Sequence, residues 1–401
     1  MESGETLVAN VTTDPGLVIN DVMPVAVSEL TTTVVESTTP EPRVADTPVV
    51  IRETTTVATR TVEAIADVPV AVGIISENEI LKTAPLSFDD LILTEPNVDT
   101  LGGPRYLGEQ ITIRGEGGNA VTVRIDDARQ NFVSGHTGQR FFVEPDFLRE
   151  VEILRGAGSF LYGSGSAGAV AGEGIEILLG GSTRDGDNIT LPDGVELANS
   201  AIERESTMAK VVLTPNNEHR FEFTLMDYDS LDQGAANPQG GVSTTNDFVG
   251  RKIDYQQFTA NYLYRPIDND LVDINATLYY NQTDQLRSYN GAFIASNAGR
   301  TNRHSLDVFG IDFSNRSEVQ IGNREHEIVF GIDFFTESQD GQESRDTFFI
   351  PGSPGNASGR PDADADHLAF YLTDEFDITE KLTFFTGLRF DTYDTRQTAG
   401  G

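Results

Sequence analysis

Apolar and polar residues alternate along most of the second half of the chain. In residues 255–264, Phe258 and Tyr262 fall on one face of an extended chain and Gln257 falls on the other, since successive side chains of a strand point to opposite faces. The same period of two returns in residues 274–280, 328–334 and 382–390. The pattern predicts long antiparallel strands from about residue 209 to 392, with one apolar face and one face suited to water.

The expected connections between these strands alternate in length. Short ones are predicted at residues 214–217, 266–270 and 377–380, and long ones, rich in Gly, Asn and Asp, at about residues 228–253, 283–303 and 338–366. Short turns at one end and long loops at the other are typical of an antiparallel transmembrane β-barrel, whereas a soluble sandwich more often has short connections at both ends. About eight strands are expected from these segments.

Residues 59–179 have a different sequence pattern, in which short apolar runs are separated by Gly, Pro and Asp. Ser76 followed by Glu79 has the spacing of a helix N-terminal capping box, and a second short helix is expected within residues 86–93. Short strands are predicted at residues 70–75, 110–115, 121–126 and 151–156. We therefore expect a small α+β domain here.

Residues 1–52 are dominated by Thr, Val, Glu and Pro and carry few aromatic residues. Such a segment buries too little apolar surface to offset the entropy of ordering it, so we expect a mobile leader. Its start, Met1 to Asn10, lacks a basic region and a continuous apolar stretch, which argues against a signal peptide. We expect the start of the natural protein to be trimmed or missing.

Composition narrows the classes of partner. The formal net charge is −35, from 28 Lys+Arg against 63 Asp+Glu, so nucleic acid phosphates would be repelled. Cysteine is absent, which excludes disulfides and thiolate ligands. No run of about 18 apolar residues marks a spanning helix, but strands that alternate apolar and polar residues never build such a hydropathy peak.

Three segments resemble the plug signatures of TonB-dependent receptors. They are Ile113–Gly115 (IRG), Val123–Gln130 (VRIDDARQ) and Val151–Val170 (VEILRGAGSFLYGSGSAGAV), and they contain Arg114, Gly115, Arg155, Gly156 and Gly163. Ala157 departs from the family, which usually has proline there. The resemblance implies an α+β plug domain at residues 59–179, followed by an incomplete antiparallel transmembrane β-barrel at residues 180–401, in the bacterial outer membrane.

The resemblance also implies a protein partner and internal ion pairs. Residues 53–58, which are Glu53, Thr54, Thr55, Thr56, Val57 and Ala58, resemble a TonB box, an extended segment that adds as a strand to a TonB-type periplasmic energy transducer. An ordinary linker is the alternative interpretation, and Thr54–Val57 are expected to be accessible. Plug arginines of the family meet acidic residues of the inner barrel wall, so acidic neighbours are expected for Arg114 and Arg155, although one or both are left facing solvent if the barrel is truncated.

His136 lies in a Gly-flanked segment, residues 131–138, that resembles the plug-apex loop of haem and haemoglobin receptors. Imidazole is a suitable ligand for haem iron, so the resemblance implies His136 as an axial ligand; an exposed histidine without a role is the alternative. Residues 184–200 resemble an acidic loop of the same branch. The resemblance implies that the first barrel strands start between Leu179 and Gly180, but the pattern predicts no strand there. A second axial histidine would come from a later barrel loop.

The remaining patterns in the sequence predict no further ligand site or catalytic site. The G-x-G-x-x-G spacing of Gly163–Gly168 does not leave a strand directly, which disfavours a dinucleotide site. Acidic residues at 362–366 indicate a solvated acidic loop rather than a site for a hard cation. No nucleophile, general base or carboxylate pair is placed for catalysis, so no enzymatic activity is expected. The remaining histidines His219, His304 and His326 are assigned to strand or turn positions.

The sequence therefore predicts an outer-membrane uptake receptor for haem, or for haem taken from haemoglobin, with outer-membrane lipid around it. It is expected to be incomplete, because plugged transporters have about 22 strands. A receptor for a siderophore or another metal chelate is the rival cargo. A truncated β-protein that binds a ligand without transporting it is the rival function, because an open sheet edge in lipid leaves backbone groups unpaired.

Overall fold

The computed structural model describes residues 54–55, 63–65, 68, 70–101, 110–117, 121–130, 142–155, 174–190, 192–197, 201–235, 248–289, 300–345, 362–379 and 382–397. The chain divides into two units, residues 1–53 and residues 54–401, and only the second contains described residues. The expected mobile leader lies outside the described residues. So do His136, Gly156, Gly163, Glu53, Thr56, Val57 and Ala58.

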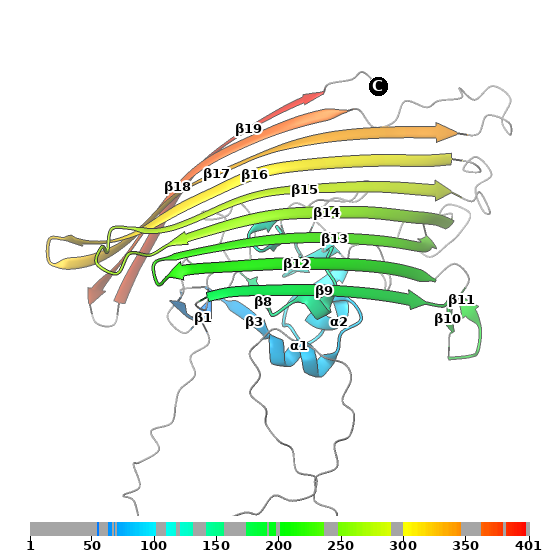
Figure 1. Ribbon diagram of the computed structural model, residues 1–401, viewed down its shortest axis with the longest axis horizontal. Helices are drawn as coiled ribbons and strands as arrows, with labels where there is room; N and C mark the ends of the chain where they lie inside the picture. The colour runs from blue at the N-terminus through cyan, green and yellow to red at the C-terminus, as the bar shows by residue number, and fades with distance from the viewer. Residues whose placement is uncertain are drawn as a thin grey trace, which may run out of the picture. The chain divides into compact units, whose positions relative to one another are not determined.

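Strands of the second unit form one nine-stranded antiparallel sheet (Figure 1). In chain order they are β9 (Gly174–Gly186), β12 (Ile202–Asn216), β13 (His219–Ala235), β14 (Phe248–Tyr264), β15 (Asp273–Tyr289), β16 (Arg300–Ile321), β17 (Arg324–Arg345), β18 (Ala363–Thr379) and β19 (Leu382–Gln397). A small hairpin of β10 (Ile189–Thr190) and β11 (Glu196–Leu197) separates β9 from β12. The predicted antiparallel meander is confirmed, and the described part of residues 201–397 contains no helix.

The two faces of this sheet differ as the alternation predicts. On β14, Tyr255, Gln257 and Thr259 are buried, and this polar face is the one that contacts the plug. Large apolar side chains are exposed on the other face, among them Phe223, Leu225, Leu278, Phe330, Leu372 and Phe390. An exposed apolar face of this kind is unfavourable in water and is typical of the lipid-facing side of a barrel wall.

The strand register confirms that the predicted apolar faces coincide. The cross-strand partners of Tyr262 on the following strands are Ala276, Phe313 and Ile332. Ile332 alternates with Phe330 and Phe334 along β17, so these residues share the face of Phe258 and Tyr262. A shift of one residue at any of these pairs would reverse the faces, which shows that the pattern also fixes the register.

The sequence pattern predicts no strand near Leu179 and Gly180, and this prediction is wrong. β9 runs through both residues and pairs with β12 along its length. Its second half lacks an apolar alternation, partly because a Cβ at Gly180 would lie 2.7 Å from the ring of Phe147 in the plug. The boundary expected between residues 179 and 180 therefore falls inside a strand of the large sheet.

The three long connections are shorter in the structure than the sequence predicts. β13 ends at Ala235 and β14 begins at Phe248, so much of residues 228–253 is strand, and the other two long connections are shortened in the same way. Polar residues occupy both faces near these strand ends, so the apolar alternation stops before the backbone pairing does. Asp364 and Asp366 accordingly lie in β18 rather than in a loop.

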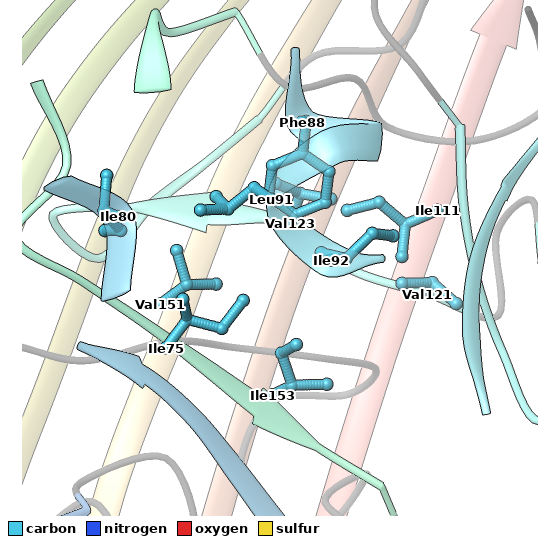
Figure 2. Packing of buried hydrophobic residues seen from close by; sticks show 10 residues of the cluster. All are labelled: Ile75, Ile80, Phe88, Leu91, Ile92, Ile111, Val121, Val123, Val151 and Ile153. Carbon is cyan, nitrogen blue, oxygen red and sulfur yellow. The ribbon is translucent and has the colours of Figure 1, made fainter. Parts of the chain in front are cut away.

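Residues 70–155 hold the predicted α+β domain, which is confirmed. Its strands pair as β3 (Val72–Ser76) with β8 (Glu150–Leu154), β4 (Val98–Leu101) with β5 (Gln110–Ile113) and β6 (Arg124–Ile125) with β7 (Ala128–Arg129), and its helices are α1 (Glu77–Thr83), α2 (Phe88–Ile92) and the 3-10 turn η2 (Pro145–Phe147). Figure 2 shows the apolar core shared by β3, β8, β5, α1 and α2, which includes Ile75, Ile80, Phe88, Leu91, Ile92 and Ile153. Among the described helices, none has the length and apolar character needed to cross a membrane.

Helix α1 begins at the predicted capping box. Glu79 Oε2 accepts hydrogen bonds from the backbone N–H and from the hydroxyl of Ser76, both at 2.8 Å. These bonds stabilise the ionised carboxylate and lower the pKa of Glu79, the backbone hydrogen bond being the larger cause. Because α1 follows β3 directly, the box fixes the point at which the chain leaves the strand and enters the helix.

Candidate functional site between the plug and the inner wall

The hairpin of β6 and β7 has a two-residue turn with an unusual backbone. Asp126 and Asp127 have φ values of 49° and 64°, which are the left-handed values of both central residues in a type I′ turn. Aspartate tolerates this conformation better than most residues that carry a Cβ. The signature segment VRIDDARQ therefore folds into a tight hairpin, and this hairpin carries most of the polar contacts between the plug and the large sheet.

Asp126 contacts three strands of the inner face. Its carboxylate accepts hydrogen bonds from Lys210 Nζ at 3.2 Å and from Thr224 Oγ1 at 2.7 Å. Its backbone oxygen accepts a hydrogen bond from Asn261 Nδ2 at 3.3 Å. Lys210 Nζ also lies 2.9 Å from Glu222 Oε2, so one ammonium bridges a carboxylate of the plug and a carboxylate of the wall. Glycine would suit the turn equally well but would provide no carboxylate for these contacts.

Arg124 makes a second, more deeply buried contact. Its side chain is 2% exposed, and its guanidinium lies 3.4 Å from Asp312 and 3.8 Å from Asp333. These two aspartates oppose each other directly on β16 and β17, an arrangement that is unfavourable for like charges. Arg389 of β19 is a further cation, 3.1 Å from Asp333. The guanidinium of Arg124 therefore offsets the repulsion between two buried carboxylates while it fixes the hairpin to the wall.

The plug arginines predicted to meet the wall lie elsewhere. Arg155 pairs with Glu95, an acidic residue of the plug itself, and Arg114 is exposed. Arg114 and Gly115 have φ values of 56° and 82°, so this pair forms a tight turn after β5. Arg155 has an acidic neighbour as predicted, but this neighbour is Glu95, which follows α2 in the plug, and not a residue of the barrel wall. Arg124, which was not singled out, makes the expected contact with the inner wall.

Two plug residues fix the ends of the segment that contains His136. Gln130 Nε2 donates to Gln257 Oε1 at 2.7 Å, and the hydroxyl of Tyr255 donates to Gln130 Oε1 at 2.7 Å. Phe142 is fully buried and packs on the ring of Tyr255, with ring centroids 4.8 Å apart. Residues 131–141 lie outside the described residues, but the residues on either side of them are both held on β14.

The described part of the TonB-box-like segment is docked on the plug. Thr54 and Thr55 form β1, which pairs with β2 (Glu63–Ala64). Thr55 is buried, and its hydroxyl donates to the buried carboxylate of Glu152 on β8. The expectation that Thr55 is accessible is therefore wrong. A buried carboxylate needs hydrogen-bond donors, and the threonine supplies one while its β-branched side chain suits a paired strand.

Replacing Thr55 with valine should loosen this docking. The change removes the hydroxyl donor and keeps the shape of the side chain, and a hydrogen bond to a charged group contributes about 1.5–3 kcal/mol. Because the chain contains no cysteine, Thr54→Cys provides a single labelling site next to it. We expect Thr55→Val to accelerate maleimide labelling of that cysteine by about 10- to 100-fold.

A matched control is Thr100→Val, which removes a similar hydrogen bond from a threonine hydroxyl to Asp89 elsewhere in the plug. It should leave the labelling rate at residue 54 unchanged. Equal labelling rates in the Thr55 variant and the unchanged receptor would mean that Glu152 does not hold the segment.

The acidic residues near the start of β18 are occupied by protein partners. Asp364 accepts a hydrogen bond from Ser338 at 2.9 Å, and Asp366 pairs with Arg396 at 2.7 Å. Within the described ranges, no group of three or more His, Cys, Asp or Glu residues is arranged to hold a metal ion.

The fold and this interface define a plug that packs on the inner wall of a membrane-type β-sheet. Residues 64–170 match the family model of the TonB-dependent receptor plug domain, and residues 206–401 match that of the TonB-dependent receptor-like β-barrel. The chain belongs to the TonB-dependent receptors, a non-enzymatic family of the bacterial outer membrane.

Comparison with individual proteins agrees with this family. A hemin receptor of Yersinia enterocolitica is 24% identical over 284 residues, which is 60% of this chain and 40% of the relative. The hemophore receptor HasR of Serratia marcescens, solved with its hemophore HasA and heme, superposes with a TM-score of 0.65 at 16% sequence identity. The match covers 82% of this chain and 53% of the HasR chain. The ferric preacinetobactin receptor BauA of Acinetobacter baumannii has a TM-score of 0.61 and 16% identity, with coverages of 86% and 61%. The chain thus spans less than two thirds of each relative, and the structural likenesses establish the fold.

Proposed function

We propose that this chain forms part of an outer-membrane receptor that takes up haem, driven by a TonB-type energy transducer. The observation that carries the proposal is the similarity to the Yersinia hemin receptor along 60% of the chain. His136 supports it, because this residue lies between Gln130 and Phe142, which are both held on the inner wall. An imidazole is a suitable axial ligand for haem iron.

The energy transducer is proposed to bind residues 53–58 by strand addition, in which backbone hydrogen bonds provide most of the affinity. Thr55 is docked against Glu152, so this residue must leave its buried position before the segment adds to another sheet. Binding of the transducer and docking on the plug therefore compete, and the contact between Thr55 and Glu152 sets part of the balance.

The haem proposal is tested by titrating the purified receptor with haem and following the Soret band. We expect His136→Ala to weaken haem binding by at least about tenfold, equivalent to about 1.4 kcal/mol, and to change the Soret spectrum because an axial nitrogen is lost. His219→Ala is the matched control. His219 is the first residue of β13 and lies beside Tyr264, whereas Phe142 packs against Tyr228, further along the same strand. It should leave both affinity and spectrum unchanged.

Two results would change the proposal. An unchanged spectrum and affinity in the His136 variant would remove this residue from the haem site. Failure of the unchanged receptor to bind haem, together with binding of a ferric siderophore, would make a siderophore the cargo.

A further inference from the structure

An uncharged polar stripe runs along the inner face of β14 and β15, where the β6–β7 hairpin packs on the large sheet. The inward side chains over residues 255–261 of β14 and 277–285 of β15 all carry a hydroxyl or an amide. We call them the uncharged lane, which consists of Tyr255, Gln257, Thr259, Asn261, Thr277, Tyr279, Asn281, Thr283 and Gln285. All of them except Asn261 are buried. The lane therefore offers many hydrogen-bonding groups and no charge.

The lane contacts the hairpin largely through the backbone of the hairpin. The side-chain amides of Gln257, Asn261 and Asn281 donate hydrogen bonds to three backbone oxygens, which belong to Ile125, Asp126 and Arg129 respectively. The ion pairs of the hairpin lie to either side of the lane, with Lys210 on β12 and with aspartates on β16 and β17. A backbone oxygen is an acceptor like any other carbonyl or carboxylate oxygen, so the same amides can donate to a ligand once the hairpin leaves.

Several buried polar atoms of the lane have no hydrogen-bond partner among the residues that the structure describes. They are the side-chain oxygens of Asn261 and Asn281, the hydroxyl of Tyr279 and both amide atoms of Gln285. Buried polar groups normally have partners, and leaving one unsatisfied costs about 1–3 kcal/mol. A surface that only held the plug would be more stable with apolar or fully paired side chains at these positions. The lane therefore has more hydrogen-bonding capacity than the docked plug uses.

We propose that the uncharged lane is the surface along which the transported ligand passes once the hairpin has left the wall. The inference rests on the proposed function, since it takes the ligand to be haem. The amides of the lane then donate to the propionate oxygens of haem in place of the backbone oxygens of the hairpin. A passage surface must bind its ligand favourably enough for entry and weakly enough for release, at several neighbouring sites. Neutral amides and hydroxyls meet this condition, whereas an arginine would hold a carboxylate by two charge-assisted hydrogen bonds.

The test places a negative charge in the lane and follows the uptake of haem, whose propionates are negative. Asn281→Asp and Asn281→Leu both remove the amide donor to Arg129, but only the aspartate repels a passing carboxylate. Gln282→Asp is the matched control, because it adds the same charge one residue away on the opposite face of β15. Three quantities are measured: haem accumulation in cells that rely on this receptor, haem affinity of the purified receptor, and hydrogen exchange of the β6 and β7 amides.

We expect Asn281→Asp to accumulate haem at least about tenfold more slowly than Asn281→Leu, because like charges brought together in a buried site repel strongly. Haem affinity should be the same in both variants, since the hairpin covers the lane while the plug is docked. Gln282→Asp should accumulate haem at the rate of the unchanged receptor. Asn261 is a less buried position of the lane, so the pair Asn261→Asp and Asn261→Leu repeats the test if Asn281→Asp fails to fold. Hydrogen exchange of β6 and β7 shows whether the plug is docked in each variant.

Equal accumulation rates in the aspartate and leucine variants at both positions would overturn the inference, because the ligand would then not meet the lane. Ferric citrate, which also presents carboxylates, separates this failure from that of the proposed function. If cells accumulate ferric citrate and not haem, at a rate that Asn281→Asp lowers relative to Asn281→Leu, the lane stands and the haem function fails. Accumulation of neither ligand by the unchanged receptor would overturn both.

Discussion

Replacing Arg124 with methionine is expected to accelerate hydrogen exchange of the β6 and β7 amides by at least about 100-fold. Removing one partner of a buried ion pair costs about 3–5 kcal/mol, because the remaining charge stays buried, and each 1.4 kcal/mol changes an opening equilibrium tenfold. Here the substitution leaves Asp312 and Asp333 directly opposed on β16 and β17. Hydrogen exchange of the receptor in detergent, read by mass spectrometry, measures the effect.

Arg114→Met is the matched control, since Arg114 is an exposed arginine of the same domain; its effect on β6 and β7 should be negligible. Adding Asp312→Asn to the Arg124 variant should restore part of the protection, because it removes one of the two opposed carboxylates. If Arg124→Met and Arg114→Met exchange at the same rate, the ion pairs with Asp312 and Asp333 do not hold the hairpin on the wall.

Phe142→Ala is expected to destabilise the docked plug by about 3–5 kcal/mol, the usual cost of truncating a buried phenylalanine. Phe142 is fully buried against Tyr228 and Tyr255, so the loss frees one end of the segment that contains His136. Hydrogen exchange of residues 142–148 should accelerate. Haem affinity should also fall by about tenfold or more, although Phe142 is not proposed to touch haem.

Phe142→Leu separates loss of packing from loss of the aromatic ring, since leucine removes less buried volume than alanine and should cost less. Its exchange rates and haem affinity should lie between those of the unchanged receptor and those of Phe142→Ala. If Phe142→Ala accelerates exchange but leaves haem affinity intact, the position of His136 does not depend on this anchor.

The fold was largely predictable because it rests on the simplest of sequence periods. In a strand with one lipid-facing and one inward face, apolar and polar residues must alternate. The faces of Phe258 and Gln257 can therefore be predicted without knowledge of the neighbouring strands. β9 was not predicted because its second half has no apolar alternation where Gly180 makes room for Phe147. The strand ends were not predicted because backbone pairing continues where both faces are polar.

The site was less predictable because its contacts join residues far apart in sequence. Arg124 lies in a segment that was recognised as a plug signature, but its aspartate partners on β16 and β17 follow from the docking of the hairpin. Thr55 was expected to be accessible, and its burial depends on Glu152, which is 97 residues away. Gln257 and Asn281 lie on the polar face of the alternation, yet only the register of β14 with β15 sets them opposite each other.

The central proposal, haem uptake that depends on an energy transducer, is tested most directly by measuring haem-iron accumulation in cells that rely on this receptor. Val57→Pro removes a backbone donor within residues 53–58 and prevents their addition as a strand, whereas Val44→Pro makes the same change outside them. We predict that Val57→Pro retains haem binding but lowers accumulation to the level of cells without the transducer, and that Val44→Pro has no effect. Accumulation that is unaffected both by Val57→Pro and by loss of the transducer would contradict the proposal.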